Sequence, residues 1–398
     1  MTMKVLLLGV GLQGKVALHD LVQSEKVTEI IAADYDIKSL QDYVKTRKYS
    51  KVETEFFDAS KQEDIDKLIG QNPDVVIDLL PVNYMDSVAK TAVKHSINLV
   101  NTFYLSHAIK ELDKKAKNNG IAVLPEFGMD PGIDLVLMGE AMRGLENVEV
   151  INSYGAGIPE LEAANNPLKY KVTWTFEGVL RSYFRAGRII KDGKVIEIKE
   201  NDMFNPKHIH EMDIESIGKL EAIPNGDALK YLKSIGIEEQ SEKFKQIKHM
   251  GRYSMRWPGH CEFWKKMVDL HLLDNELVDI DGVKINRKKY LAKVIEPHIQ
   301  LEPEERDLAI LLIELVGLKD GKKTRVIYQV IDKRDLKTGF TAMSRTVGFT
   351  ASIGAQMLGT NQITKKGLLS PVNDIPFDFF KKELEKRNIN IIIKHEPI

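Results

Sequence analysis

The sequence predicts a doubly wound parallel α/β sheet followed by a second, α+β domain. Three observations support this fold class: residues 1–125 alternate short apolar runs with helical patterns, paired strand patterns around tight turns follow residue 130, and a helical pattern rich in small residues occupies 342–358. Alternating strands and helices with short connections favour right-handed βαβ units, and hence a parallel sheet with helices on both faces.

Short apolar runs mark the expected strands of the parallel sheet, at residues 4–8, 29–33, 54–57, 75–80, 98–101 and 121–124. Helical patterns lie between them, at 13–24, 37–49, 62–69, 84–95 and 106–119. Two hairpins are predicted later in the chain, at 187–198 around Asp192-Gly193 and at 308–332 around Asp320-Gly321.

The change of pattern predicts three parts: residues 1–130 as the parallel-sheet domain, 131–340 as the α+β domain, and 341–398 as a C-terminal segment. The expected helix in this last part carries small side chains on several faces, at Ser344, Gly348, Ala351, Ser352 and Ala355. Small side chains let another element approach closely, so we expect this segment to pack back on the first domain.

Composition excludes several classes of protein. The 398 residues include 57 basic and 58 acidic side chains, a formal net charge of −1, which gives no electrostatic basis for binding nucleic acid. The longest apolar run, 308–313, stops at Glu314, far short of a membrane span. No secretory signal is expected, and the single Cys261 excludes an intrachain disulfide, so the sequence predicts a cytoplasmic protein.

A glycine-rich turn links the first expected strand to the first expected helix. Residues 6–14 read Leu-Leu-Leu-Gly-Val-Gly-Leu-Gln-Gly, the G-x-G-x-x-G pattern in the context that dinucleotide binding requires. Its first glycine permits a tight turn, its second lets the backbone approach a pyrophosphate, and its third allows close helix–sheet contact. We therefore expect a Rossmann-like domain whose pyrophosphate site consists of Gly9, Gly11, Leu12, Gln13 and Gly14.

The next strand ends supply the other expected cofactor contacts. Asp34 lies 20 residues after Gly14, the spacing of a carboxylate that accepts hydrogen bonds from the adenosine ribose. Because a carboxylate there repels a 2′-phosphate, the sequence predicts NAD in preference to NADP, unless Lys38 reaches the ribose. Asp58 is either an adenine-side contact or a solvated strand-end carboxylate. Two further residues, Leu80 and Pro81, are expected near the nicotinamide half of the cofactor.

Segments outside the glycine turn form a second set of motifs, at 102–104 (Thr-Phe-Tyr), 126–132 (Glu-Phe-Gly-Met-Asp-Pro-Gly), 165–171 (Asn-Asn-Pro-Leu-Lys-Tyr-Lys), 224–227 (Pro-Asn-Gly-Asp), 256–262 (Arg-Trp-Pro-Gly-His-Cys-Glu) and 364–368 (Thr-Lys-Lys-Gly-Leu). Together they resemble the saccharopine dehydrogenase family, which includes saccharopine reductases and lysine 6-dehydrogenases. The resemblance implies a nucleotide-binding domain, then a substrate and dimerisation domain, and oxidation of a carbon–nitrogen bond at the ε-nitrogen of lysine.

Residue by residue, the resemblance implies substrate contacts for Tyr104, Asp130 and Asn225. Gly226 stands where the family's Pro-Asn-Arg-Asp motif has arginine, which weakens the case for a dicarboxylic substrate. The stretch 220–236 is nonetheless closer to the reductases. Saccharopine is therefore the first expected substrate, and its cleavage would give 2-aminoadipate semialdehyde and glutamate. Lysine is the alternative substrate, and its reaction would be oxidative deamination.

Oxidation of an amine to an imine also needs a proton acceptor, and the candidate acid–base groups are Tyr104, Asp130, His260 and Lys171. Each residue also has a structural alternative. Tyr104 could be a packing aromatic side chain, and Asp130 could organise a turn or cap a helix. His260 could be a hydrogen-bonded internal histidine, and Lys171 could be held in an ion pair. Lys171 and Arg256 are also expected to bind substrate carboxylate, with Arg252 and Arg185 as further cations. Glu126 is a candidate for orienting the cofactor amide or ribose.

The non-enzymatic alternative is an NAD(H)-binding sensor or scaffold, because a dinucleotide-binding fold does not by itself imply catalysis. No metal site is expected, since His208 and His210 lack the other ligands of a known metal-binding spacing. We expect a homodimer with a small-molecule substrate and no nucleic-acid or membrane partner. In an enzyme of this kind, Leu80, Tyr104, Glu126 and Asp130 should converge on one pocket, with His260 projecting into it from the second domain.

Overall fold

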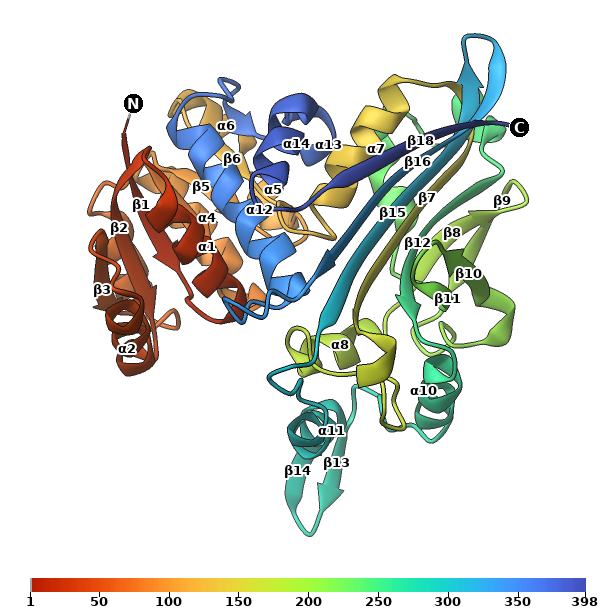
Figure 1. The fold of residues 1–398 in the computed structure, drawn as a ribbon, viewed down its shortest axis with the longest axis horizontal. Helices are drawn as coiled ribbons and strands as arrows, with labels where there is room; N and C mark the ends of the chain where they lie inside the picture. The colour runs from red at the N-terminus through yellow and green to blue at the C-terminus, as the bar shows by residue number, and fades with distance from the viewer. Residues whose placement is uncertain (1) are drawn as a thin grey trace. The chain divides into compact units, whose positions relative to one another are not determined.

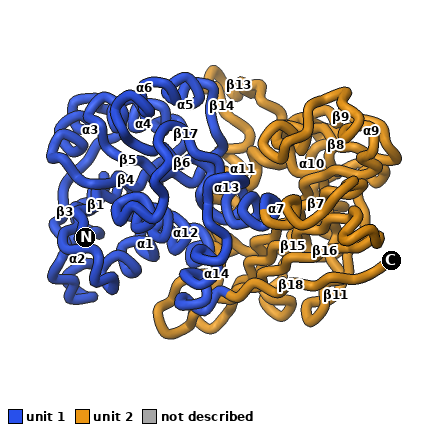
Figure 2. The backbone as a smooth tube through the Cα atoms, turned by 90° about the horizontal axis from the view of Figure 1, so that it is seen from above, with its two compact units in different colours: residues 1–139, 344–389 blue, residues 140–343, 390–398 orange. Residues whose placement is uncertain are grey.

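The computed structural model describes residues 2–398, which form two compact units (Figure 2). Unit 1 comprises Met1–Gly139 and Ser344–Ile389, and unit 2 comprises Glu140–Met343 and Asn390–Ile398. Each unit is therefore built from two separate stretches of the chain.

Unit 1 contains a seven-stranded parallel sheet in the order β17-β6-β5-β4-β1-β2-β3 (Figure 1). The strands are β1 (Met3–Leu8), β2 (Val27–Asp34), β3 (Val52–Phe56), β4 (Val75–Asp78), β5 (Asn98–Asn101), β6 (Ala122–Leu124) and β17 (Gly367–Leu368). The expected parallel α/β sheet is confirmed, and a short strand from the C-terminal segment adds its seventh member.

The helices of the first stretch of unit 1 are α1 (Leu12–Gln23), α2 (Ile37–Arg47), α3 (Gln62–Ile69), η1 (Val82–Tyr84), α4 (Met85–Lys94), α5 (His107–Lys110) and α6 (Asp113–Asn118). The single helix expected at 106–119 is thus divided into α5 and α6. Ser106 caps α5, since its side chain accepts a hydrogen bond from the Ile109 N–H at 3.1 Å.

The core of unit 1 follows from the apolar runs that were recognised as strands. Leu6, Leu8, Ile31, Val76 and Leu99 are fully buried on one face of the sheet, against side chains of α3 and α4. Strands buried on both faces need continuous rather than alternating apolar sequence, which is why these runs carry so few polar residues.

The C-terminal part of unit 1 contains α13 (Pro371–Asp374) and α14 (Phe377–Glu385), while α7 (Ile133–Arg143) and α12 (Ala342–Gly359) each cross a boundary between the units. A Cβ on Gly348 of α12 would lie 2.5 Å from the Gln13 carbonyl oxygen and 2.7 Å from the Val16 Cβ. Glycine therefore allows α12 to pack directly on α1, as the small residues predicted.

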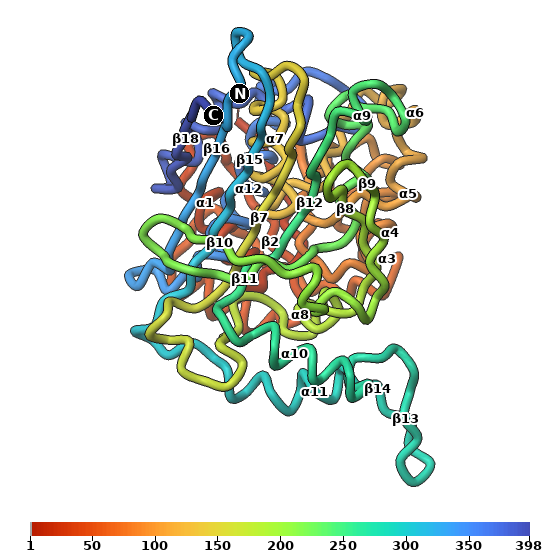
Figure 3. Tube along the Cα trace, turned by 90° about the vertical axis from the view of Figure 1, so that its right-hand side faces the viewer, coloured from red at the N-terminus to blue at the C-terminus, as the bar shows by residue number. Residues whose placement is uncertain are grey.

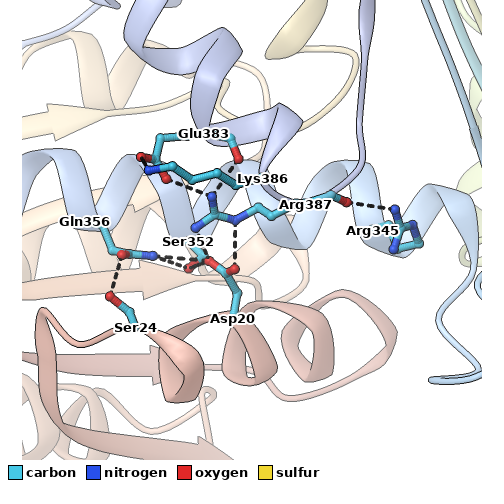
Figure 4. A network of polar contacts seen from close by, with 8 residues as sticks. All are labelled: Asp20, Ser24, Arg345, Ser352, Gln356, Glu383, Lys386 and Arg387. Atoms are coloured by element: carbon cyan, nitrogen blue, oxygen red, sulfur yellow. Dashed lines mark hydrogen bonds and ion pairs between the residues drawn. The ribbon is translucent and has the colours of Figure 1, made fainter.

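A buried polar network fixes these C-terminal helices to α1 (Figure 4). Arg387 donates from Nε and Nη2 to the two carboxylate oxygens of Asp20, each at 2.7 Å, and from Nη1 to Glu383 at 2.9 Å. Asp20 also accepts from the Ser352 hydroxyl at 2.6 Å and from Gln356 at 3.1 Å. The network joins three helix regions that lie far apart in the sequence.

Unit 2 contains a nine-stranded sheet in which β10-β11-β12-β7-β15-β16-β18 follow one another, while β8 pairs with β12 and with β9. The strands are β7 (Glu146–Pro159), β8 (Gly187–Lys191), β9 (Lys194–Ile198), β10 (His210–Ile214), β11 (Gly218–Pro224), β12 (His249–Arg256), β15 (Asp307–Lys319), β16 (Lys322–Lys333) and β18 (Ile391–Pro397). Figure 3 shows β12, β7, β15 and β16 running side by side.

Both predicted hairpins are present in unit 2, as β8–β9 and β15–β16. A third, β13 (Leu277–Ile280) with β14 (Val283–Asn286), forms its own two-stranded sheet. The remaining helical elements are η2 (Leu161–Ala163), α8 (Phe176–Ser182), η3 (Pro206–His208), η4 (Ala228–Tyr231), η5 (Lys233–Ile235), α9 (Glu242–Gln246), α10 (His260–Asp269), α11 (Arg287–Ile295) and η6 (Glu296–His298).

The boundaries between the units differ from the predicted divisions at 130 and 340. The last nine residues, 390–398, belong to unit 2 rather than to the segment that returns to unit 1, because β18 pairs antiparallel with β16. Backbone pairing of this kind leaves no compositional signal at the point where the chain changes unit. Within residues 2–398, none of the helices combines the length and apolar character needed to cross a bilayer.

Candidate functional site

The glycine turn of unit 1 has the geometry of an anion-binding helix start. Gly9 adopts φ +87°, and a Cβ there would lie 2.9 Å from the Leu79 carbonyl oxygen, so only glycine fits this turn. Gly14 packs so tightly that a Cβ would lie 2.1 Å from the Gly9 oxygen. The first contact agrees with the tight turn expected at Gly9, whereas the second is a contact of Gly14 with the turn itself and not with a strand.

The other side of the same turn is open. Outside its chain neighbours, Gly11 has no atom within 4 Å of the place a Cβ would occupy, and both Gly11 and Leu12 are exposed. No side chain caps the start of α1 and no acidic residue lies in its first turn. The free N–H groups and the positive end of the helix dipole are therefore available to a pyrophosphate, and the residues present fit a dinucleotide.

Asp34 holds this turn in place from the end of β2. One carboxylate oxygen accepts from the Val10 N–H at 2.7 Å, and the other accepts from the Asp36 N–H at 2.9 Å. Asp36 in turn caps α2 by accepting from the Ser39 N–H at 3.1 Å. The carboxylate expected to bind the ribose thus has a structural task within unit 1.

The predicted contacts at the other strand ends have local partners of their own. Asp58 accepts from the Ser60 hydroxyl at 2.6 Å and from the Ser60 N–H at 3.1 Å, and these bonds lower the pKa of Asp58. These local bonds favour the alternative stated for Asp58, a solvated carboxylate at the end of a strand. Leu80 is half-buried and Pro81 is exposed, directly after β4.

Asp78, the last residue of β4, was not among the predicted site residues. It is 3% exposed, and its carboxylate accepts from the Leu80 N–H at 3.1 Å. Burial raises the pKa of Asp78 from 3.8 to about 7. The sequence did carry a signal for this residue: an aspartate ends an apolar strand, and ligands of parallel sheets bind at the C-terminal ends of the strands.

Two predicted substrate segments lie together at this edge. The Glu126 N–H donates to the Phe103 carbonyl at 3.0 Å, and the Phe127 N–H donates to the Asn101 carbonyl at 2.9 Å. These bonds place the turn that carries Tyr104 beside the segment that leads to Asp130. Glu126 is 8% exposed, whereas Tyr104 and Asp130 are half-buried.

In unit 2, His260 lies inside a group of buried aromatic and cationic side chains. Its Nδ1 is 2.6 Å from the Leu168 carbonyl oxygen, and its Nε2 is 2.7 Å from the Tyr183 hydroxyl. The same hydroxyl accepts from Arg256 Nε at 2.9 Å. His260 is completely buried, and Arg256 is 5% exposed.

The partners fix the protons of this group. A carbonyl oxygen only accepts, so His260 Nδ1 carries the proton and Nε2 accepts from Tyr183. Burial, reinforced by the positive charge of Arg256, lowers the pKa of His260 to about 3, and burial raises that of Tyr183. Both ring nitrogens of the neutral His260 are engaged within unit 2, which favours the structural alternative over proton transfer.

The other predicted cations also have internal partners. Lys171 Nζ lies 2.7 and 2.6 Å from the two carboxylate oxygens of Glu305, which is the ion-paired alternative named for this lysine. The Arg256 guanidinium donates to the Met255 carbonyl at 2.8 Å and lies 5.6 Å from the ring centres of Tyr170 and Tyr183.

Asn225, the remaining predicted substrate contact, is half-buried. It follows β11, and its backbone N–H donates to the Arg252 carbonyl at 2.7 Å. Arg252 is itself buried and lies 4.8 Å from the ring centre of Tyr231. This turn therefore lies against β12 in unit 2.

The parallel sheet and the open glycine turn define a dinucleotide-binding protein with a second, independent sheet unit. A family model described as the saccharopine dehydrogenase NADP binding domain matches residues 5–124, and one described as the saccharopine dehydrogenase C-terminal domain matches residues 128–389. The chain belongs to the saccharopine dehydrogenase family, as its motifs predicted.

Known relatives agree with this assignment. The mitochondrial alpha-aminoadipic semialdehyde synthase of Rattus norvegicus is 26% identical, over 92% of this chain and 45% of the relative. The saccharopine dehydrogenase (NADP(+), L-glutamate-forming) of Saccharomyces cerevisiae is 24% identical, over 99% of each chain. The chain thus spans about half the length of the first relative and nearly all of the second.

A solved structure shows the same fold. The apo histidine-tagged saccharopine dehydrogenase (L-Glu forming) from Saccharomyces cerevisiae matches with a TM-score of 0.85 at 23% identity, covering 99% of each chain. The architecture of a Rossmann-like domain combined with a second α/β sheet domain is therefore that of a known structure.

The prediction that NAD is preferred over NADP is wrong. The matching family model describes an NADP binding domain, and the yeast relative is named as NADP(+)-dependent. The prediction took Asp34 to be free for the ribose and repulsive toward a 2′-phosphate. In the structure, each of its oxygens accepts a backbone N–H, one from the nearby Asp36 and one from Val10, and the Val10 bond is a tertiary contact that sequence spacing does not reveal.

Proposed function

We propose that this chain is an NADP-dependent oxidoreductase that cleaves saccharopine to 2-aminoadipate semialdehyde and glutamate, or catalyses the reverse reaction. The observation that carries the proposal is the match of both family domains, in order, over residues 5–124 and 128–389. The name of the yeast relative, which covers the whole chain, supports the glutamate-forming direction of cleavage.

The proposed reaction breaks the bond between the secondary amine of saccharopine and its lysine-derived carbon. That carbon loses a hydride and the amine nitrogen loses a proton, which gives an imine. Water then adds to the imine carbon, and the carbon–nitrogen bond breaks to release aldehyde and glutamate. When bound, NADP⁺ supplies the hydride acceptor and leaves as NADPH.

Unit 1 supplies the proposed cofactor site. Gly11 and the start of α1 bind the pyrophosphate through backbone N–H groups, while Asp34 keeps the turn in its binding shape. Lys38, exposed in the first turn of α2, is our proposed partner for the 2′-phosphate. A lysine there provides the positive charge that a phosphate monoester requires.

Tyr104 and Asp130 remain the proposed substrate contacts of unit 1, and either group is a candidate proton acceptor. The backbone hydrogen bonds of Glu126 and Phe127, which join the segments of these two residues, support this pairing. Arg256 and His260 are proposed to act through Tyr183 as positioning residues, because each has a hydrogen bond to the Tyr183 hydroxyl inside unit 2.

The test is an assay of the purified chain with NADP⁺ and saccharopine, following the absorbance of NADPH. We expect NADPH to form with saccharopine and not with free lysine. Turnover of lysine alone would instead assign the chain to the lysine 6-dehydrogenases. Tight binding of the nucleotide without turnover of either amino acid would favour the sensor, and each of these two results contradicts the proposal.

The predicted homodimer stays a prediction. Light scattering of the purified chain at several concentrations tests it directly, since a stable dimer gives twice the chain mass throughout. A mass equal to one chain would contradict it.

A further inference from the structure

Arg185 lies over the glycine that replaces the family's arginine. It belongs to the connection between α8 and β8 of unit 2 and is half-buried. A Cβ on Gly226 would lie 3.4 Å from Arg185 Cζ and Nε and 3.5 Å from Nη2, and these are the three nearest atoms. A side chain at position 226 would therefore begin in contact with this guanidinium.

The Arg185 guanidinium has unused hydrogen-bonding capacity. Its Nε is buried and has no hydrogen-bond partner among the described residues. Within residues 2–398, no carboxylate forms an ion pair with Arg185. A buried donor without a partner costs free energy in the unliganded protein, and a ligand that accepts its hydrogen bond recovers that cost.

Neighbouring contacts hold Arg185 in this place. Arg188 donates to one oxygen of Asp227 from Nε at 3.1 Å and from Nη2 at 2.7 Å, and the two residues also form an isolated parallel bridge. A Cβ on Gly187 would lie 2.5 Å from the Gly226 carbonyl oxygen, so the two backbones are in close contact. The turn bearing Arg185 is thus fixed to the turn bearing Gly226.

The nearby carboxylate, that of Asp227, already has hydrogen-bond partners for both of its oxygens. The second oxygen of Asp227 accepts from the Leu229 N–H at 3.0 Å, which caps η4, while the first is bound to Arg188. Asp227 therefore neutralises Arg188 and leaves the charge of Arg185 available. Tyr183, two residues before Arg185, is held by Arg256 and His260, which anchors the same connection from its other end.

We propose that Arg185 binds a carboxylate of the glutamyl part of the substrate, from over Gly226, and so supplies the cation that the sequence lacks at position 226. The inference rests on the proposed function, because it takes saccharopine as the substrate. A guanidinium pairs with a carboxylate through two parallel N–H···O bonds, a geometry that ammonium does not offer. Because Gly226 has no side chain, nothing from position 226 covers the Arg185 guanidinium.

The experiment compares Arg185→Met with the unchanged chain in steady-state kinetics. We expect the KM for saccharopine to rise about 30-fold, with a smaller change in kcat, because the lost contact binds a part of the substrate remote from the reacting carbon. Arg185→Lys should recover only part of this loss, since it restores charge without the bidentate geometry. The Kd for NADP⁺ and the thermal midpoint should stay close to those of the unchanged chain.

The matched control is Arg181→Met, which removes an exposed guanidinium from the nearby helix α8 and should leave the KM unchanged. A second comparison adds Gly226→Arg to Arg185→Met: an arginine restored at 226 should lower the KM again if the two positions serve one subsite. Gly226 has φ +77°, so this double variant is judged only if its thermal midpoint shows that it folds.

An unchanged KM in Arg185→Met, with the chain folded and turning over saccharopine, would overturn the inference and leave the proposed function standing. Failure of the proposed function looks different, because the unchanged chain itself then fails to oxidise saccharopine. In that case calorimetric titration of the unchanged chain and Arg185→Met with L-glutamate and NADP⁺ still tests the carboxylate site. Equal affinity of the two proteins, or no binding by the unchanged chain, would overturn it.

Discussion

Lys38 is the residue on which the proposed NADP site makes its sharpest prediction. Replacing it with methionine removes one charged hydrogen bond to the 2′-phosphate and should weaken NADP⁺ binding about tenfold. Binding of NAD⁺, which lacks that phosphate, should not change. Fluorescence titration with both nucleotides measures the two Kd values.

Lys45→Met provides the control for Lys38, because it removes an exposed lysine from the same helix at its opposite end. It should leave both nucleotide affinities unchanged. Parallel weakening of NADP⁺ and NAD⁺ by Lys38→Met would show that the lysine acts on the shape of α2 and not on the phosphate.

Asp78 predicts a specific dependence of stability on pH. Its pKa is raised from 3.8 to about 7, so between these values the folded chain keeps a proton that the unfolded chain releases. The contribution of Asp78 to the free energy of unfolding therefore falls as pH rises from about 4 to about 7, and it is constant above that range. Asp78→Asn should remove this loss, an effect on the order of 4 kcal/mol at pH 8.

Urea unfolding across this pH range measures the free energy of unfolding of the unchanged chain and of Asp78→Asn. The two values are subtracted because burial also raises the pKa of Asp307, to about 6, so that Asp307 makes the free energy of unfolding fall with pH in both proteins. Asp42→Asn, on the exposed face of α2, controls for the loss of one carboxyl group. Parallel stability curves for Asp78→Asn and the unchanged chain would contradict the prediction.

At the scale of elements, the C-terminal helices are joined to α1 by one buried ion pair. The side chains of Arg387 and Asp20 are each 10% exposed, and Arg387 also binds Glu383. Arg387→Met leaves the buried carboxylate of Asp20 without its cation, while Glu383 keeps Lys386, and should lower the free energy of unfolding by about 3 kcal/mol. Chemical denaturation, monitored by fluorescence and circular dichroism, gives the value.

Lys386→Met is the comparison for this element-scale test. Lys386 pairs with the same Glu383, but its side chain is 67% exposed, so its loss should cost less than about 1 kcal/mol. Equal effects of the two substitutions would indicate that the network of Figure 4 does not carry the attachment of α14 to α1.

At the scale of the whole molecule, the division of the chain into two units predicts that removing the C-terminal strand affects unit 2 and leaves unit 1 unchanged. Residues 390–398 form β18 and belong to unit 2, although residues 344–389 just before them belong to unit 1. Deleting 390–398 removes the partner of β16 from Thr324 to Val330. We expect faster proteolysis in unit 2 and an unchanged affinity of unit 1 for NADP⁺.

Limited proteolysis with mass spectrometry locates the cuts, and a titration with NADP⁺ reports on unit 1. Cuts concentrated in residues 1–139, or a marked loss of nucleotide affinity, would contradict this assignment of the C-terminal strand. The chain without the deletion, digested in parallel, is the control.

The sequence by itself determined the class of fold, and it predicted where a nucleotide binds. Apolar strands such as 4–8 and 98–101, and the glycines at positions 9, 11 and 14, are local signals, because strand burial and the turn geometry depend on neighbouring residues in the chain. Their positions in β1, β5 and the start of α1 agree with the prediction. The family motifs likewise identified the family.

Only the tertiary structure decided which polar groups are free. Asp34, Lys171 and His260 have the residue types that cofactor or substrate binding needs, yet their partners Val10, Glu305 and Tyr183 lie 24, 134 and 77 residues away. Arg185 gains its proposed role in the same way, from a contact with Gly226 across the fold. A hydrogen bond between distant residues is fixed by packing of the whole unit, and local sequence carries no record of it.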